Sequence, residues 1–358
     1  MNSAEMQPDR TDMSEFDFIK AAFGKPHARV PIWIMRQAGR YLPEYRLVRE
    51  RVSFEELCHS PKLIAEVTAQ PIDVFGFDAA ILFSDILLPL EPLGIRVSYD
   101  NGGPRLSPMI LRPEDIGHLT GYDPAEAMTY VLSGIREIKK QMGDVVPLIG
   151  FAGSPFTLVC YLVEGGGSWD FLQTKKFLYN HPKAAAQLLD LLADLTGRYL
   201  KEQINAGADA VQLFDSWGGI LPPDVYRDFS LPHIKTVFEI CRTEGIPRLL
   251  YLNNSAPYLP FLAELDCEVI SVDWRTDIEQ AIAVLDGKAV QGNLDPHLLL
   301  GPAELVHRET LKILEATAGK DNFIFNLGHG IHPETPLENV RLVVDTVHAF
   351  MRDNDAHQ

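Results

Sequence analysis

Charged side chains in this 358-residue chain recur directly after short apolar runs, where they could do chemistry. Arg36 and Arg40 stand four residues apart around Gly39, after the first such run. If this segment turns helically, the two guanidiniums share a face, and each can bind a carboxylate through two hydrogen bonds. Two surface arginines on a solvated face are the simpler alternative. Gly39 predicts a loop whose backbone comes close to another group.

One acid, Asp85, stands in the apolar stretch 83–88 that follows the second run. A carboxylate in such surroundings must be paired, hydrogen-bonded or functional. Asp also caps helix N-termini after strands, and the sequence favours neither interpretation over the other.

His329 stands between Gly328 and Gly330 at the end of the eighth run. With so little bulk beside it, the imidazole is predicted to face a cleft, and its pKa range suits proton transfer or carboxylate binding. An imidazole that bonds to a loop backbone is the alternative. Ser216 has a weaker claim because serine is common in Gly-rich turns, and Tyr161 alone would more often be a core residue whose hydroxyl reaches a partner.

The elements that position these residues follow from hydrophobic patterning. Short runs rich in Val, Ile, Leu and Phe, without polar alternation, are separated by helical patterns and predict a parallel sheet covered on both faces. The candidate strands are residues 31–34, 79–83, 147–151, 208–214, 248–252, 269–272, 289–292 and 323–327. Eight such strands predict an α/β fold, a single (β/α)8 TIM barrel with its active site at the carboxyl ends of the strands.

Helices are predicted between these strands, and several begin at proline. They cover residues 61–75, 124–142, 182–206, 224–242, 277–285, 303–318 and 337–351. Near residues 94–110 the turn signal Asp100-Asn101-Gly102-Gly103 predicts an inserted β-hairpin that decorates the barrel. The charge-free run 145–163 contains two prolines and predicts a buried strand followed by a turn, not a membrane span. We expect one domain over residues 16–352, with tails at 1–15 and 353–358.

Composition excludes several classes of function. With 32 Lys and Arg against 49 Asp and Glu, the net charge is −17, which argues against nucleic acid as a partner. An acidic ligand would need a local cluster of arginines. Four dispersed cysteines predict reduced, buried thiols without disulfide or zinc, and the acidic start of the chain is unlike a signal peptide. Nucleophile-elbow, zinc-helix, phosphate-loop and dinucleotide motifs are missing, which favours a cofactor-free reaction.

Six ordered motifs together resemble the uroporphyrinogen decarboxylase family. The most specific is MRQAGRYLPEYR at residues 35–46. The others are FSDIL at 83–87, GFAGSPFTL at 150–158 with YLVEGGGS at 161–168, QLFDSWGG at 212–219, QGNLDP at 291–296 and NLGHGIHPETP at 326–336. The similarity covers nearly the whole chain, roughly residues 18–351.

The resemblance implies a single (β/α) barrel, a homodimer that acts in the cytoplasm without metal or prosthetic group. It implies a carboxy-lyase that converts the four acetate side chains of uroporphyrinogen III to methyls, giving coproporphyrinogen III and four CO2 in heme biosynthesis. The family's substrate-binding residues map onto Arg36, Gln37, Ala38, Gly39, Arg40, Asp85, Tyr161, Ser216 and His329. One region departs from the family, in which a basic residue and glycine often follow the fifth strand, whereas this chain has Asn253-Asn254-Ser255.

The implied chemistry agrees with these residue types. A pyrrole protonated at its α-carbon accepts the electrons released with CO2, so no cofactor is needed. Arg36 and Arg40 suit the substrate's carboxylates, and Asp85 suits the cationic ring. The proton donor stays open: His329 matches better on pKa, while Arg36 is the family's usual candidate and could act through bound water.

Two alternatives come from other classes. A corrinoid-linked methyltransferase shares this fold but binds zinc through histidine and cysteine, and this chain has no H-x-C pair. A non-catalytic tetrapyrrole carrier would need the cleft but not the acid Asp85. Glycines 165–167 predict a flexible loop that could serve as a lid.

Overall fold

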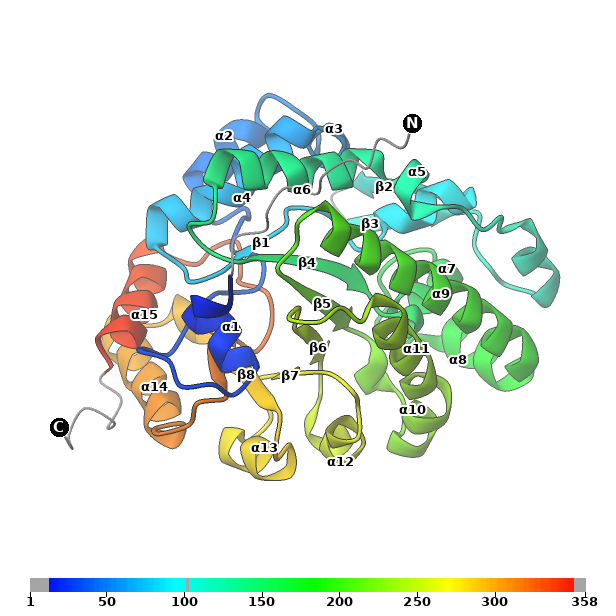
Figure 1. Ribbon diagram of the computed structural model, residues 1–358. Coiled ribbons are helices and arrows are strands. Elements are labelled where there is room, and N and C mark those ends of the chain that lie inside the picture. The colour runs from blue at the N-terminus through cyan, green and yellow to red at the C-terminus, as the bar shows by residue number, and fades with distance from the viewer. Residues whose placement is uncertain (1–12, 101–102, 351–358) are drawn as a thin grey trace, which may run out of the picture.

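A curled parallel sheet forms the centre of the computed structural model, which describes residues 13–100 and 103–350 (Figure 1). Within these residues, seven strands pair side by side in the order β1-β4-β5-β6-β7-β8-β9. They are β1 (Ala80–Ile81), β4 (Leu148–Gly153), β5 (Ala210–Asp215), β6 (Arg248–Leu252), β7 (Val269–Val272), β8 (Ala289–Leu294) and β9 (Phe323–Leu327). Each contains or overlaps a predicted strand. The expected tails fall mostly outside the described residues, although Met13–Glu15 forms a short 3-10 helix, η1.

The predicted strand at residues 31–34 is reduced to a single bridge. Ile32 pairs with Phe325 of β9 in parallel orientation, and the carbonyl of Ile32 accepts a hydrogen bond of 2.8 Å from the backbone N–H of Asp78, just before β1. This segment therefore closes the barrel between its first and last strands. Pro31 carries no N–H to donate, so a full ladder cannot form there.

Helices surround the sheet, as the coloured ring of ribbons in Figure 1 shows. Those that follow the predicted alternation are α4 (Pro61–Phe75), α5 (Pro124–Ala127), α6 (Thr129–Met142), α9 (Pro182–Ala206), α10 (Pro223–Phe229), α11 (Leu231–Cys241), α13 (Ile278–Val284), α14 (Ala303–Ala316) and α15 (Leu337–Ala349). The shorter α1 (Asp17–Ala22), α2 (Pro43–Arg49), α3 (Phe54–His59), α8 (Leu172–Asn180) and α12 (Leu259–Ala263) lack a long apolar period and were not predicted.

The turn expected after β4 is a helix, α7 (Pro155–Glu164). Ser154 caps it, since its hydroxyl accepts a hydrogen bond of 3.2 Å from the backbone N–H of Thr157. Ser at the N-cap followed by Pro at the first helical position is a helix start signal. The prediction of a turn was therefore wrong, because Gly153 ends β4 and Pro155 begins α7 directly after the cap residue.

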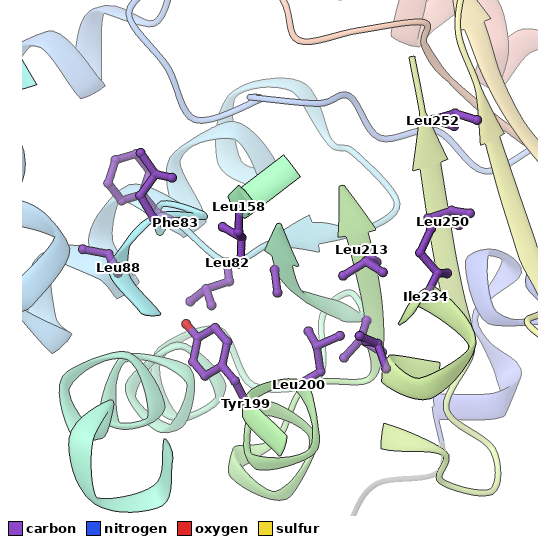
Figure 2. Close-up of a cluster of buried hydrophobic side chains, with 14 of the residues drawn as sticks. Leu82, Phe83, Leu88, Leu158, Tyr199, Leu200, Leu213, Ile234, Leu250 and Leu252 are labelled. Carbon is purple, nitrogen blue, oxygen red and sulfur yellow. The ribbon is translucent and has the colours of Figure 1, made fainter. Parts of the chain in front are cut away.

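Two hydrophobic cores hold the barrel together. The larger lies between the sheet and the helices, and Figure 2 shows part of it, with Leu213, Leu250 and Ile234 pointing toward one another. The smaller fills the barrel interior, where residues from all seven strands or their flanks pack against Phe18 and Ile19 of α1. Because α1 packs against these inward-facing side chains, it closes the amino-terminal end of the barrel and leaves the carboxyl end open.

A polar layer crosses the interior above this core. Trp33 Nε1 donates to Gln291 Oε1 at 2.9 Å, and Gln291 Nε2 donates to Gln212 Oε1 at 3.1 Å and to Ser271 Oγ at 2.9 Å. All four side chains are buried. Buried polar networks of this kind help to fix one arrangement of the strands around them, although Gln212 Nε2 makes no hydrogen bond within the described residues.

The inserted hairpin is present as β2 (Arg96–Asp100) and β3 (Gly103–Ser107), paired antiparallel with Tyr99 opposite Pro104. Residues 101–102 of its turn lie outside the described residues. The 3-10 helix η2 (Leu88–Leu93) leads from β1 into the hairpin. The hairpin is more than decoration, since it walls the site described next.

Candidate active site

A cavity of about 710 Å³ opens at the carboxyl ends of the strands. Small-molecule sites occupy about 300–1,000 Å³. Ile81, Phe151 and Phe214 form an apolar floor, in which the two phenylalanine rings meet edge to face at 5.6 Å. Seven of the nine predicted binding residues line the cavity: Arg36, Ala38, Gly39, Arg40, Asp85, Ser216 and His329. The apolar floor suits a flat ring, and the polar wall suits its charged substituents.

Arg36 has a left-handed backbone conformation, with φ of 63°. The segment from Arg36 to Arg40 forms turns and bends, so the condition for a shared helical face is not met, although both arginines reach the same cavity. Gly39 is required here, because a Cβ at this position would lie 2.9 Å from the carbonyl oxygen of Arg36. The prediction that the loop makes a close approach at Gly39 is confirmed.

Gln37 points into the protein and does not line the cavity. Its side chain is fully buried, and its Nε2 donates to the carbonyl of Ala79 at 3.2 Å. The hydroxyl of Tyr41 donates to the carbonyl of Gln37 at 2.8 Å. Gln37 thus ties the arginine-bearing segment to the start of β1.

Asp85 follows β1, and its Oδ1 accepts a hydrogen bond of 2.8 Å from the backbone N–H of Leu87. This bond stabilises the turn before η2, whose N-cap is Leu87 and which has no side-chain cap, so the capping interpretation of Asp85 was wrong. The Asp85 side chain lines the cavity, and its functional role stays a prediction. Burial raises the pKa of the Asp85 carboxyl, against the opposing effects of the Leu87 N–H, the nearby Tyr99 hydroxyl and the Arg36 charge.

Three arginines, Arg36, Arg40 and Arg49, line the cavity, and Asp85 is the one acid among the lining residues that the structure describes. The whole chain carries a net charge of −17. A cationic wall on an acidic protein concentrates the attraction for an anion at this one place. The arginine cluster required for an acidic ligand is therefore present.

The His329 imidazole stacks nearly parallel to two aromatic rings. The ring of Trp274 lies 6.2 Å away at 9°, and that of Tyr251 lies 5.9 Å away at 16°. The Arg275 guanidinium in turn lies 3.8 Å from the centroid of the Trp274 ring. Burial, followed by the positive charges of Arg36 and Arg275, lowers the pKa of His329 to about 4. The imidazole is therefore neutral at pH 7.

Both glycines beside His329 provide space. A Cβ at Gly328 would lie 2.2 Å from the backbone nitrogen of Trp274, and a Cβ at Gly330 would lie 2.4 Å from Cδ of Arg36. His329 itself lines the cavity, as the sequence predicted.

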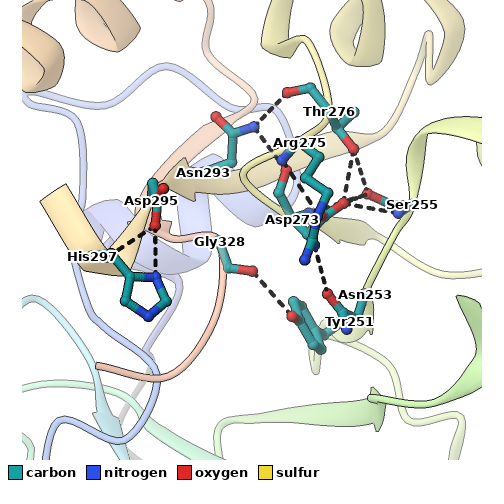
Figure 3. Close-up of polar contacts among 10 residues, drawn as sticks. All are labelled: Tyr251, Asn253, Ser255, Asp273, Arg275, Thr276, Asn293, Asp295, His297 and Gly328. Atoms are coloured by element: carbon teal, nitrogen blue, oxygen red, sulfur yellow. Dashed lines mark hydrogen bonds and ion pairs between the residues drawn. The ribbon is translucent and has the colours of Figure 1, made fainter. Parts of the chain in front are cut away.

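Asp273, directly after β7, organises the neighbouring loop (Figure 3). Its carboxylate accepts hydrogen bonds from the N–H and hydroxyl of Ser255 at 2.9 and 3.0 Å, from Thr276 Oγ1 at 3.0 Å and from Arg275 at 2.8 Å. Burial acts to raise the pKa of Asp273, but these bonds lower it overall. Arg275 also donates to Asn253 Oδ1 at 3.3 Å. Asn253, which belongs to the stretch that departs from the family pattern, thus accepts a hydrogen bond from Arg275, just after the next strand, β7.

The QGNLDP motif at residues 291–296 supports the site rather than lining it. Asn293 Nδ2 donates to the carbonyls of Asp273 and Thr276 at 3.0 and 2.7 Å, which anchors the loop that carries Arg275 (Figure 3). Asp295 Oδ1 accepts from the backbone N–H of His297 at 2.9 Å, which caps the 3-10 helix η6 (Pro296–Leu300).

Ser216 lines the cavity at the end of β5, where the buried Asp215 fixes the backbone before it. Asp215 accepts hydrogen bonds from Ser154 Oγ at 2.5 Å, Thr157 Oγ1 at 3.0 Å and Ser230 Oγ at 3.2 Å. Burial raises the pKa of Asp215, and these three hydroxyls oppose that shift. Asp215 therefore joins β5 to α7 and α11 from inside the protein.

Tyr161 on α7 is not among the residues that line the cavity. Its ring lies 6.3 Å from that of Trp217, and burial raises the pKa of its phenol. The charges of Asp85 and Arg36 both act on that phenol, so it lies near the site.

The glycine loop at residues 165–167 is attached to the hairpin. The backbone N–H of Leu106 donates to the carbonyl of Gly165 at 3.0 Å, and Arg105 forms an isolated bridge with Gly166. Glu164, just before the loop, accepts two hydrogen bonds from Thr174. That this loop serves as a lid stays a prediction.

Sequence reasoning missed one wall of the cavity and the residues behind His329. Tyr45, Arg49, Phe54 and Tyr99 line the cavity from α2, α3 and the hairpin. Only Tyr45 had a signal, since it falls within the MRQAGRYLPEYR motif. Asp273 and Arg275 directly follow a predicted strand, and the rule that found Asp85 would have found them too.

All four cysteines are free and buried, as predicted. Among residues 13–100 and 103–350, no group of three or more His, Cys, Asp or Glu side chains is arranged to hold a metal ion. In the same residues, no helix is long and apolar enough to cross a membrane.

Comparison with known proteins agrees with the motifs. Residues 13–350 match the family model of uroporphyrinogen decarboxylase, URO-D. The uroporphyrinogen decarboxylase of Syntrophotalea carbinolica is 46% identical over 335 residues, which cover 93% of this chain and 97% of that protein. The uroporphyrinogen decarboxylase of Anaeromyxobacter dehalogenans is 45% identical over 340 residues, 93% of this chain and 98% of that protein.

Among solved structures, a methyltransferase from Methanosarcina mazei is similar over 93% of this chain and 98% of its own, with a TM-score of 0.78 and 23% identity. A B12-independent methionine synthase from Shewanella is similar over 89% and 94%, with a TM-score of 0.56 and 13% identity. These two likenesses show a shared fold and no more. The family model and the relatives go further, and they show that the chain belongs to the uroporphyrinogen decarboxylase family.

Proposed function

We propose that this protein is a carboxy-lyase that converts the four acetate side chains of uroporphyrinogen III to methyls, giving coproporphyrinogen III and four CO2 in heme biosynthesis. The observation that carries this proposal is a cavity whose described lining residues include one carboxylate, Asp85, together with three arginines and an apolar floor. A ring that bears many carboxylates and becomes cationic during reaction needs this combination. Family membership supports the same activity.

The chemistry needs no external electron sink. A proton adds to the α-carbon of the pyrrole, and the ring becomes cationic. The bond between the acetate methylene and its carboxylate then breaks, CO2 leaves, and the electron pair enters the ring. A proton adds to the exocyclic carbon to give the methyl, and loss of the α-proton restores the pyrrole. Each decarboxylation consumes one proton, and the protein must bind anions and stabilise a cation.

Asp85 is assigned to the cation. Its carboxylate faces the cavity and would accept hydrogen bonds from pyrrole N–H groups, so its negative charge lies close to the ring when the ring is protonated. Arg36 and Arg40 are assigned to the carboxylates, which guanidinium groups bind through two parallel hydrogen bonds. Arg36 also carries charge near Asp85, so it can orient the reacting acetate beside the ring.

The proton donor is assigned to Arg36, acting through a bound water molecule. His329 was the better match by its ordinary pKa, but its pKa of about 4 in this site leaves almost no imidazolium at neutral pH. A neutral imidazole can still donate one hydrogen bond to a carboxylate. We assign His329 to carboxylate binding on this basis.

The remaining predicted residues have supporting roles. Ser216 and Tyr161 would donate hydroxyl hydrogen bonds to carboxylates at the rim, and the small residues Ala38 and Gly39 would let the substrate come close to the backbone. Gln37 is buried away from the cavity. We therefore assign it to holding the arginine segment, with any contact to substrate made through its backbone.

We further propose that the enzyme works in the cytoplasm as a homodimer, without metal, prosthetic group, nucleic-acid partner or membrane. Free, buried cysteines fit a reducing compartment, and the net charge disfavours nucleic acid. The dimer rests on the family resemblance, and light scattering of the purified protein measures it directly.

The first experiment is an anaerobic incubation of the purified protein with uroporphyrinogen III and EDTA, with products separated by their number of carboxyl groups. We expect the hepta- to tetracarboxylate series without any added cofactor. Substrate that binds but stays unchanged would instead support the tetrapyrrole carrier. Absence of binding, together with zinc in a metal analysis and thiol methylation, would support the methyltransferase.

A further inference from the structure

The hairpin brings an unpaired hydroxyl into the active-site cavity. Tyr99, in β2, lines the cavity together with Asp85. Its hydroxyl oxygen is buried and has no hydrogen-bond partner within hydrogen-bonding distance and angle among the described residues. Burying a polar group without a partner costs about 1–3 kcal/mol. Such a group at a functional site calls for a role that satisfies it.

Aromatic packing fixes the Tyr99 ring relative to Asp85. The ring meets Phe54 edge to face at 4.6 Å, and Phe54 meets Phe83 in the same way at 6.0 Å. Phe83 is two residues before Asp85 in the chain. The hydroxyl therefore cannot move far from the carboxylate without breaking these contacts.

Two donors and one cation act on the Asp85 carboxylate. The N–H of Leu87 donates to Oδ1 at 2.8 Å, Arg36 contributes a positive charge, and the Tyr99 hydroxyl is close enough to favour the ionised carboxylate. An ionised carboxylate offers about four acceptor positions. Leu87 and Tyr99 would occupy two of them and leave two for pyrrole N–H groups.

The other titratable groups that interact with Asp85 do not compete for this role. Burial raises the pKa of the Cys58 thiol and of the Tyr161 phenol, so both are neutral at pH 7. Glu91 interacts with Asp85 through its charge, but its carboxylate is paired with His59 at 3.2 Å. Within the described part of the chain, Ser84 and Tyr99 each bring a buried hydroxyl without a partner to the cavity wall, and of these two only Tyr99 acts on the Asp85 carboxyl.

We propose that Tyr99 is a positioning residue whose hydroxyl donates a hydrogen bond to ionised Asp85 and holds the carboxylate toward the pyrrole ring. The inference rests on the proposed function and adds a residue to it. A donor to the charged form of a carboxyl favours that form. Tyr99 would thus keep Asp85 ionised at lower pH than burial alone would permit.

The test is Tyr99→Phe, which removes the hydroxyl and keeps the ring packing on Phe54. Tyr179→Phe is the matched control, because Tyr179 is exposed on α8. The apparent pKa of the acid limb in the plot of kcat/KM against pH should rise by about half a pH unit to one pH unit in Tyr99→Phe. It should stay in place in the control. An unmoved limb would overturn the proposal, and so would a rise in KM alone, which would make Tyr99 a substrate ligand.

A second measurement does not depend on turnover. The carbonyl stretch of protonated Asp85, isolated by subtracting the infrared spectrum of Asp85→Asn from that of wild type, can be titrated directly. We expect Tyr99→Phe to shift this titration upward by the same amount, whereas an identical titration in both proteins contradicts the hydrogen bond. An inactive wild type would reject the proposed function, and the infrared titration would still decide whether Tyr99 bonds to Asp85.

Discussion

The side chain of Arg36 lies across Gly330, and the two residues are 294 positions apart in the chain. A Cβ at residue 330 would come within 2.4 Å of Arg36 Cδ and 2.8 Å of Arg36 Nε. Gly330 does not have a positive φ, so the position needs space and not the conformational freedom of glycine. The Arg36 side chain can therefore occupy this position in the cavity only because residue 330 has no side chain.

Gly330→Ala should displace Arg36 and leave the fold intact. A misplacement of about 1 Å can cost on the order of 100-fold in rate, so we expect kcat/KM for uroporphyrinogen III to fall about 10- to 100-fold. The melting temperature should change little, because the displaced guanidinium end can move into solvent. Gly121→Ala is the control, since residue 121 is exposed and no atom lies within 4 Å of a Cβ there. Equal activity of the two variants would contradict a role for Gly330 in positioning the Arg36 side chain.

Much of the fold could be predicted from local patterns. The strands at residues 248–252, 269–272 and 323–327 and the helices at 61–75 and 182–206 have the predicted bounds. The predicted helix 224–242 divides at Ser230, because Pro232 has no N–H for a continuous helix and its ring clashes with the preceding turn. Strand 31–34 was overestimated, since pairing across the barrel closure depends on tertiary contacts that local hydrophobicity does not record.

Asp85→Asn tests the stabilisation of the cationic ring. The amide keeps the shape and loses the charge, so substrate binding should persist while kcat falls by about tenfold or more. In wild type, burial raises the pKa of this carboxyl, and activity needs its ionised form. Activity should therefore be lost as pH falls through a value above the ordinary aspartate range, and this limb should vanish in the variant. A variant with wild-type kcat would remove Asp85 from the chemistry.

The site could be predicted only where its residues follow strands. Arg36, Asp85, Ser216 and His329 were found in this way, and they line one cavity. Tyr99 could not be found, because nothing in the hairpin sequence says that the insertion folds back over the barrel mouth. Stacking between residues far apart in the chain is equally invisible to local spacing.

Arg275→Gln should raise the pKa of His329. The Arg275 charge is one of the causes that lower this pKa, and removing a cation at this range should raise it by about half a unit. Histidine NMR signals followed against pH, with His329→Gln to assign the resonance, measure the shift. Arg308→Gln, an exposed arginine on α14, should leave the resonance unmoved. An unchanged titration in Arg275→Gln would show that the guanidinium on Trp274 has only a packing role.

His329 should also make the folded state sensitive to mild acid. Its pKa is about 4 in the folded state and 6.5 without perturbation, so between these values the unfolded chain binds a proton that the folded chain does not. Stability is then lost as pH falls from about 6.5 toward 4. With these two pKa values, the free energy of unfolding should fall by about 2 kcal/mol between pH 7 and pH 5. Urea unfolding followed by circular dichroism should show wild type losing about that much more than His329→Gln over this interval. Equal losses in the two proteins would mean that the imidazole takes up a proton in the folded state as readily as in the unfolded chain.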